Sequence, residues 1–360
     1  MLESQEIMKE WRERLSELDT LVRRDSRKAY AFYQEDPAAE RELALRGRGL
    51  GGFVTAGKAI FLSFLRKLHP ARRISYLAGL GLFFWGFWNN DWTAAIFGFL
   101  VLNFLLALEL SEKLLTKNEL EIARAIQFSL YPVSNPRLPR LQVASHFQPA
   151  REVGGDYYDF ALEGHRRFTV ILGDVSGKGI AAALYAMKLQ ALFELMGRGS
   201  LGPKEMLVEM NDVISERIER NYFITAVVGV LDLENDKLVL ARAGHNHPLH
   251  FSSRTGTASW LKPNGVGIGM RKSPIFDRLL EEVRVPLARG DVLIFYTDGV
   301  TEAMNPQMEP FGYPRLEGLL TECAHMTAED IKQELLRRLD AFRKGQEFGD
   351  DVTLVVTKLI

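Results

Sequence analysis

The chain has 360 residues, enough for one large domain and a smaller partner, because domains usually contain about 100–200 residues. Its formal net charge of -1 gives no overall attraction for nucleic acid, so we expect no nucleic-acid partner. The single cysteine, Cys323, excludes an intramolecular disulfide framework, and the histidines show no zinc-binding spacing with it.

Residues 1–73 are predicted to form a helical, basic N-terminal region. The first twenty residues are charged and helical in character, which does not fit a signal sequence. Between Leu43 and Asn90 the chain has no acidic residue, but it has these basic ones: Arg46, Arg48, Lys58, Arg66, Lys67, Arg72 and Arg73. A basic helix with an apolar face is typical of a segment that lies on an anionic membrane surface.

Residues 74–108 are predicted to form a two-helix transmembrane hairpin. Ile74–Trp88 and Trp92–Leu108 are almost wholly apolar, and each is close to the lower limit of about 17 residues for a span. A polar tip, 89–91, separates them. Interfacial aromatic residues belong near such a tip, and three are there: Trp85, Trp88 and Trp92. Arg72 and Arg73 place both ends on the cytoplasmic side. The alternative is a buried hairpin of a soluble regulatory domain.

Residues 109–131 are predicted to form a helical stalk. Charges of both signs alternate with apolar residues, and neither Gly nor Pro occurs before Pro132. The spacing of Leu115, Ile122 and Ser129 is an imperfect heptad, which fits a parallel dimer and a plain connector equally well. Because proline cannot continue a helix, we place the domain boundary at 132–136 and the start of the second domain at residue 137.

Beyond the linker the pattern predicts an α+β domain. Short β-branched and aromatic runs indicate strands at Phe168–Leu172, Phe223–Asp232, Lys237–Ala243, Glu282–Val285, Val292–Tyr296 and Val352–Leu359. Helical patterns cover Ile180–Met196, Pro203–Glu219 and Thr327–Arg343, the last with Thr327 as its N-cap. Strands that follow one another, with grouped helices, favour antiparallel sheets with the helices on the outside.

Carboxylates are concentrated in four glycine-containing turns of this domain. They lie in Gly154-Gly155-Asp156, in Gly173-Asp174, in Asp298-Gly299 and in Gly349-Asp350-Asp351, beside runs that read as strands. A sheet can bring such strand ends together, but carboxylates repel each other unless a cation lies between them. Oxygen ligands of this kind suit Mg²⁺ or Mn²⁺. The sequence therefore predicts a metal site.

Five motifs in order carry a resemblance to a known family. They are Phe147–Glu152 leading into Gly154–Asp159, Gly173–Gly179, Ala243–Pro248, Thr297–Glu302 and Asp350–Thr353. Over roughly residues 119–360 the chain resembles bacterial serine/threonine phosphatases of the protein phosphatase 2C superfamily, in the branch of sporulation stage II protein E and the sigma-factor-regulating phosphatases. The resemblance implies two stacked antiparallel sheets flanked by helices, with a centre of two Mn²⁺ or Mg²⁺ ions at one edge.

The resemblance also implies roles for single residues. The metal ligands would be Asp156, Asp174, the Val175 carbonyl, Asp298 and Asp350, with Asp351 a less certain neighbour. Arg151 matches a phosphate-binding arginine. The ions would activate a water for direct hydrolysis of a phosphoserine or phosphothreonine. One departure is that Ser176 and Lys178 stand where the eukaryotic branch has a histidine that is a candidate general acid.

The expected partner is a phosphorylated regulatory protein of the kind that antagonises an anti-sigma factor. A homodimer through the stalk or the catalytic-domain helices, and attachment to the cytoplasmic membrane with the catalytic domain facing the cytoplasm, are expected too. Two alternatives remain. Gly154-Gly155-Asp156 after a helical stalk is also similar to membrane-tethered signalling nucleotidyl cyclases, against which Tyr157-Tyr158 and Asp350-Asp351 argue. The other is a phosphoprotein-binding scaffold without catalytic activity.

Overall fold

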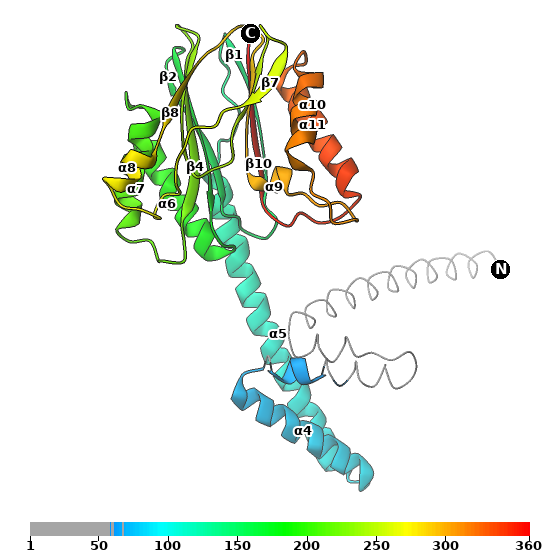
Figure 1. The fold of residues 1–360 in the computed structure, drawn as a ribbon. Coiled ribbons are helices and arrows are strands. Elements are labelled where there is room, and N and C mark those ends of the chain that lie inside the picture. Colours follow the sequence, from blue (N-terminus) through cyan, green and yellow to red (C-terminus); the bar gives the residue numbers. More distant parts are fainter. Residues whose placement is uncertain (1–57, 59–60, 67) are drawn as a thin grey trace, which may run out of the picture. The chain divides into compact units, whose positions relative to one another are not determined.

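A computed structural model describes residue 58, residues 61–66 and residues 68–360 (Figure 1). Most of the predicted helical, basic N-terminal region, residues 1–73, therefore lies outside the described residues. The chain divides into two compact units, Met1–Leu115 and Thr116–Ile360, and each is described by itself. The second unit begins at Thr116, inside the predicted stalk and before the predicted boundary at 132–136.

In the first unit, two helices are joined by the predicted polar tip. Helix α4 covers Pro70–Trp88, and helix α5 covers Trp92–Ser129, so the predicted second span and the stalk form one unbroken helix. Asn90 adopts a left-handed backbone with φ 58°. The Asp91 carboxylate accepts the N–H groups of Thr93 at 3.1 Å and Ala94 at 3.3 Å, which satisfies donors that the start of a helix leaves unpaired.

Glycines allow α4 and the first part of α5 to pack at very short distance. A Cβ on Gly86 would collide with the backbone of Ala95, and one on Gly98 would lie 2.7 Å from the carbonyl oxygen of Gly79. Small residues at such positions are typical of helix pairs that pack inside membranes. At the other end of the hairpin, the Arg72 guanidinium pairs with the Glu109 carboxylate at 3.1 Å.

Large apolar side chains cover the outside of this hairpin. The most exposed include Phe84, Phe87, Trp88, Phe97, Leu100 and Phe104. Among the described residues, α5 is the one helix that is long and apolar enough to cross a membrane; α4, which begins with Arg72 and Arg73 in its first turn, is not.

The second unit contains two five-stranded antiparallel sheets, as predicted. The first sheet has the order β1 (Leu141–Gln148), β10 (Val352–Leu359), β9 (Val292–Tyr296), β6 (Leu249–Ser252) and β7 (Thr257–Trp260). The second has the order β2 (Asp156–Glu163), β3 (Arg167–Val175), β4 (Ile224–Asp232), β5 (Lys237–Ala243) and β8 (Glu282–Pro286). The α+β class and the stacked-sheet architecture are confirmed.

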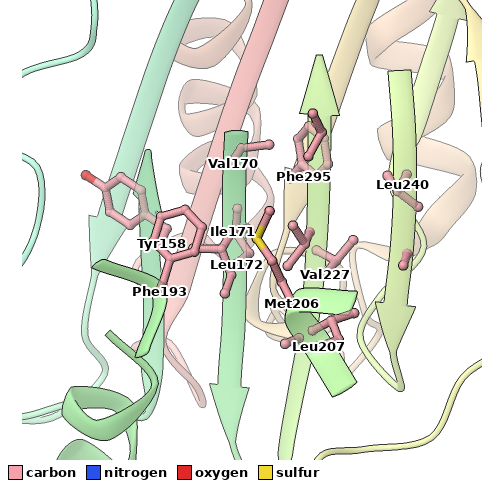
Figure 2. Packing of buried hydrophobic residues seen from close by; sticks show 14 of the residues in the cluster. Tyr158, Val170, Ile171, Leu172, Phe193, Met206, Leu207, Val227, Leu240 and Phe295 are labelled. Carbon is pink, nitrogen blue, oxygen red and sulfur yellow. The ribbon is translucent and has the colours of Figure 1, made fainter. Parts of the chain in front are cut away.

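The main core fills the space between the two sheets and continues on the outer face of the second sheet, under the helices that cover it. Successive residues of a strand point to opposite faces, and β9 shows this clearly. Leu293 and Phe295 belong to the core shared with the second sheet, whereas Ile294 and Tyr296 belong to a separate cluster under helices. Figure 2 shows Phe295 among the residues of the shared core, with Met206 of helix α7 (Pro203–Ser215) beside the second sheet.

Helices cover the outer face of each sheet (Figure 1). On the second sheet lie α6 (Ile180–Met196), α7 (Pro203–Ser215) and α8 (Ile275–Leu279); on the first lie α10 (Gly312–Cys323) and α11 (Ala328–Arg343). The predicted N-cap is confirmed, since Thr327 accepts the N–H of Asp330. The prediction that the second helix continues to Glu219 is wrong, because α7 ends at Ser215 and is followed by turns.

Trp260, at the end of β7, fixes α10 to the first sheet. Its indole N–H donates to the Glu317 carboxylate at 2.8 Å. Its rings lie edge-on to Tyr313 of α10, with centroids 5.4 Å apart, and to Tyr296 of β9, at 6.1 Å. Edge-to-face pairs of this kind stabilise packing beyond the area that they bury.

Candidate functional site

The register of β2 and β3 brings the first two predicted site residues together. Asp156 and Asp174 are direct partners across the antiparallel pair, so they lie on the same face of the sheet. The Val175 N–H donates to the carbonyl of Gly155 at 3.3 Å. A Cβ on Gly155 would lie 2.9 Å from the Val175 carbonyl oxygen, so any other residue at this position would crowd this oxygen.

The first sheet contributes the other two acids from neighbouring strand ends. Asp298 begins the short helix α9 (Asp298–Thr301), directly after β9, and Asp350 and Asp351 directly precede β10. The Thr297 N–H donates to the Thr353 carbonyl at 3.0 Å, which joins the two segments. All four carboxylate-bearing turns therefore meet at one edge of the sandwich, as predicted.

The Asp156 carboxylate connects the two sheets. Its Oδ2 accepts the hydroxyl of Thr297 at 2.7 Å and the hydroxyl of Thr353, and the whole side chain is buried. Both threonines belong to motifs of the sequence, but the motifs alone predict no role for them. Their position in the sequence is the signal that could have found them, because Thr297 directly precedes Asp298 and only Val352 separates Thr353 from the Asp350-Asp351 doublet.

Asp351 has a different environment from Asp350. One of its carboxylate oxygens accepts the N–H of Ala150 at 2.8 Å, and the other accepts the N–H of Gly155 at 2.7 Å and of Asp156 at 3.4 Å. Its carboxylate thus holds the backbone that leads into β2. Both carboxylate oxygens of Asp351 therefore already have backbone N–H partners.

Burial and mutual repulsion raise the pKa of the clustered carboxyls. Burial, followed by the charges of Asp298 and Asp350, raises the pKa of Asp174 to about 7. Burial and the Asp350 charge raise the pKa of Asp298 to about 6, and burial and Asp174 raise that of Asp156 well above its ordinary value. Each shift means that the charged form of the carboxyl is unfavourable at this edge, first because it is buried and then because its neighbours are acidic.

The donor chemistry of this edge fits a divalent cation, although the side chains are not closed around one. Among residues 58, 61–66 and 68–360, no group of three or more His, Cys, Asp or Glu side chains is already arranged to hold a metal ion. The repelling carboxylates and the Val175 carbonyl are nevertheless the hard oxygen donors that Mg²⁺ and Mn²⁺ prefer. A cation among them would relieve the repulsion that raises their pKa values.

Two cationic side chains border the acidic edge. The Lys178 ammonium lies 2.8 Å from an Asp350 oxygen and donates to the Gly349 carbonyl at 2.6 Å. Arg151 is exposed, and it lines a small pocket together with Lys178, Asp350 and Asp351. The Ser176 hydroxyl accepts the N–H of Phe223 at 2.8 Å, so it fixes the turn.

Other polar residues of the motifs have structural partners. Asp159 accepts the Tyr157 hydroxyl at 2.7 Å. His245 is buried beside the Thr225 hydroxyl, 2.9 Å from its Nδ1, and burial lowers its pKa to about 3, so its imidazole is neutral. Two residues that sequence reasoning missed, Gln127 and Tyr131, bond the backbone of Gly154 and Asp156.

We expect the metal-free protein to show a pH dependence that Asp174→Asn removes. A carboxyl whose folded-state pKa is raised binds a proton more tightly when the protein is folded. Ionisation of Asp174 therefore destabilises the fold as the pH rises from 3.8, the ordinary pKa of the group, to about 7, its pKa in the folded protein. In chelator, the variant should match the wild type near pH 4. At pH 8 it should melt higher by about 5 °C or more. Thermal melts across this range would measure the difference, and equal melting at pH 8 would contradict the repulsion.

Comparisons with known proteins point in one direction. The family described as stage II sporulation protein E matches residues 164–360. The chain is 32% identical to protein IcfG of Synechocystis over 66% of the chain and 41% of IcfG, so it spans less than half of that relative. It is 28% identical to phosphoserine phosphatase RsbU of Bacillus subtilis, over 67% of the chain and 70% of RsbU. The fold resembles the SiaA-PP2C domain of Pseudomonas aeruginosa, with a TM-score of 0.57 and 21% identity over 69% of the chain and 98% of that domain.

Proposed function

Because the chain belongs to the family of stage II sporulation protein E, we propose that residues 116–360 are a metal-dependent protein serine/threonine phosphatase. The observation that carries the proposal is the meeting of Asp156, Asp174, Asp298 and Asp350 at one edge of the sandwich, where burial and repulsion raise the pKa values of the first three. An edge at which buried carboxylates repel one another is unfavourable for folding, and a divalent cation is the partner that would make it favourable.

Four aspartates and one carbonyl would hold the ions: Asp156, Asp174, Asp298, Asp350 and the Val175 oxygen. When bound, two Mg²⁺ or Mn²⁺ ions would supply Lewis acidity and an activated water for direct attack on phosphorus. Asp174 lies opposite Asp156 and is repelled by both Asp298 and Asp350, so it is the best placed to contact both ions. Asp350 would exchange its contact with Lys178 for a metal ion. We assign Asp351 to positioning Gly155 rather than to binding metal.

The two bordering cations suit the substrate. A phosphate monoester carries about two negative charges at neutral pH, and a guanidinium can bind two of its oxygens at once. Arg151 is exposed at the rim of the pocket that includes Asp350, so we propose that it orients the phosphoryl group. Lys178, once released from Asp350, would be a second positive charge beside the same group.

We propose that the substrate is a phosphoserine or phosphothreonine on a regulatory protein. The similarity to RsbU, a phosphoserine phosphatase by its name, supports this substrate class. An anti-sigma-factor antagonist is the specific candidate from the resemblance. The homodimer predicted from the stalk stays a prediction.

We also propose that residues 74–108 anchor the chain in the cytoplasmic membrane. The exposed phenylalanines and tryptophans of α4 and α5 support this, as does the glycine packing of the hairpin. Arg72 and Arg73 at the open end of the hairpin would keep that end, and the phosphatase domain, on the cytoplasmic side.

The phosphatase proposal makes a direct prediction about metal. The full chain in detergent should release phosphate from a phosphoserine peptide when Mn²⁺ or Mg²⁺ is added, because the acidic edge needs a divalent cation to bind and attack the ester. Excess chelator should stop the reaction, and fresh metal should restore it. Phosphate release would be measured by a colorimetric assay. A rate unaffected by chelator would refute metal dependence. Metal binding without hydrolysis of any phosphopeptide would instead favour a phosphoprotein-binding scaffold without catalytic activity.

A further inference from the structure

The two residues before Asp156 have no side chains that could hold the backbone in place. Gly154 and Gly155 precede Asp156, and a Cβ on Gly154 would collide with the Asp351 carboxylate. Glycine also has the greatest backbone freedom of any residue. The Thr297 and Thr353 hydroxyls bond the Asp156 carboxylate, and groups from elsewhere that bond this backbone therefore help to fix the position of Asp156.

Gln127, in the last turn of α5, is one such group. Its side-chain N–H donates to the Gly154 carbonyl at 2.7 Å, and its side-chain oxygen accepts the Gly154 N–H at 3.1 Å. The side chain is buried, with 3% exposure. A carboxamide carries one donor group and one acceptor, and here it satisfies both backbone groups of a single residue.

Tyr131, four residues further on, holds the next part of the same backbone. Its hydroxyl donates to the Asp156 carbonyl at 2.6 Å, and its ring is stacked on Phe147 with centroids 4.3 Å apart. Between these two contacts, Gly155 is held by Asp351 and by the Val175 N–H. Gln127 in the last turn of α5 and Tyr131 just after that helix therefore supply two of the side chains that bond the backbone of Gly154, Gly155 and Asp156.

We propose that Gln127 is a positioning residue for the metal centre, which holds Asp156 in place through the backbone of Gly154. The inference rests on the proposed function, in which Asp156 is a metal ligand. Gln127 bonds neither the Asp156 carboxylate nor, in this proposal, the substrate. Its effect is therefore on the position of Asp156 as a metal ligand. Tyr131 gives a second, parallel support. The last turn of the helix that sequence reasoning assigned to a connector is thus part of the site.

The test compares Gln127→Leu with Gln142→Leu in the full chain in detergent. Gln142 is a matched control, because its side-chain oxygen also accepts a backbone N–H, that of Ala328 at 3.1 Å, on a strand and helix away from the acidic edge. Both variants lose a glutamine-to-backbone contact, and leucine is close to glutamine in size. A purely structural role predicts similar behaviour for the two.

Three readouts separate the variants. In Gln127→Leu, amide hydrogen exchange of residues 153–157 in chelator should become about tenfold faster, because two backbone groups lose their partners. The Mn²⁺ dissociation constant from calorimetry should rise about 10- to 100-fold, as for other groups that orient metal ligands. At saturating metal, kcat on an aryl phosphate should fall with KM little changed. Gln142→Leu should leave all three at wild-type values.

Tyr131→Phe keeps the test valid if Gln127→Leu does not fold, because it removes a single hydroxyl. It should speed exchange in the same segment and weaken Mn²⁺ binding in the same direction. Wild-type exchange and Mn²⁺ affinity in a folded Gln127→Leu protein, or equal losses in Gln142→Leu, would overturn the proposal. If the wild type binds Mn²⁺ but hydrolyses no phosphate ester, the proposed phosphatase function fails, while exchange and Mn²⁺ affinity still decide the role of Gln127.

Discussion

Replacing Asp174 by asparagine is expected to lower phosphatase activity by at least about a hundredfold while the protein stays folded. Groups that only orient metal ligands cost about 10- to 100-fold when they are changed, and a direct ligand should cost no less. Asparagine keeps the shape of the side chain but removes the charge that a cation needs. Asp174 faces Asp156 across the β2–β3 pair, and Asp298 and Asp350 both raise its pKa, so no other acid is as central.

Stability and activity should move in opposite directions in this variant. Without metal, the wild-type carboxylate is repelled by its neighbours, so its removal should not lower the melting temperature above neutral pH. Asp277→Asn is a suitable control, since Asp277 pairs with Lys204 at 3.1 Å and is not part of the acidic edge. Initial rates at saturating Mn²⁺, with circular dichroism of each variant, would measure both effects. An Asp174→Asn protein with more than half of wild-type activity would exclude this acid as a ligand.

Deleting residues 74–108 is expected to move the chain from the membrane pellet to the soluble fraction. The large side chains that cover the hairpin, such as Phe84, Phe97 and Phe104, are exposed, and their transfer from water to lipid is favourable by about 25 cal/mol for each Å² of apolar surface. The intact chain should therefore resist extraction by carbonate. Fractionation followed by immunoblotting would show where each form is found.

A salt wash separates this anchoring from attachment by charge. Basic residues such as Arg66, Arg72 and Arg73 would also attract an anionic surface, but that attraction is screened at high ionic strength. Release of the intact chain by 1 M salt would show that charge alone holds it. A chain that stays soluble without detergent would show instead that the hairpin is covered by protein.

Long elements with a regular pattern were predictable from the sequence. The helix at Ile180–Met196 and the strand at Lys237–Ala243 have the predicted bounds, because unbroken apolar periodicity and flanking glycines or charged turns leave few alternatives. The continuity of the helix from the apolar span into the stalk was harder to predict. Apolar and charged halves look like two elements, yet no Gly or Pro interrupts them near Leu108 and they form one helix.

Short or irregular elements were missed for identifiable reasons. Strand β1 is an edge strand that contains Gln142, Ser145 and His146, so it lacks an apolar run. Strands β6 and β7 have only four residues each. Helix α10 includes Gly312 and Gly318, which lower helix propensity, and its Pro314 lies in the first turn, where proline is tolerated.

The acids of the site were predictable, but their partners were not. Motif order identified Asp156 and Asp298, whereas the bond from Thr297 to Asp156 joins residues 141 apart in the sequence, and no local pattern reports it. From the sequence alone, Asp350 and Asp351 are also hard to tell apart as metal ligands. Only the folded backbone shows that Asp351 accepts the N–H groups of Ala150 and Gly155, while Asp350 lies beside Lys178.

The position of Trp260 gives residues 116–360 an intrinsic fluorescent reporter. Of the five tryptophans in the sequence, the other four precede Thr116, so residues 116–360 contain one indole fluorophore. This indole lies against Tyr296, whose next neighbours along the chain are Thr297 and Asp298. Its emission wavelength and quenching therefore sense the packing of α10 on β9 two residues from a proposed metal ligand, without any attached dye. Movement of that turn can be followed by intrinsic fluorescence in real time.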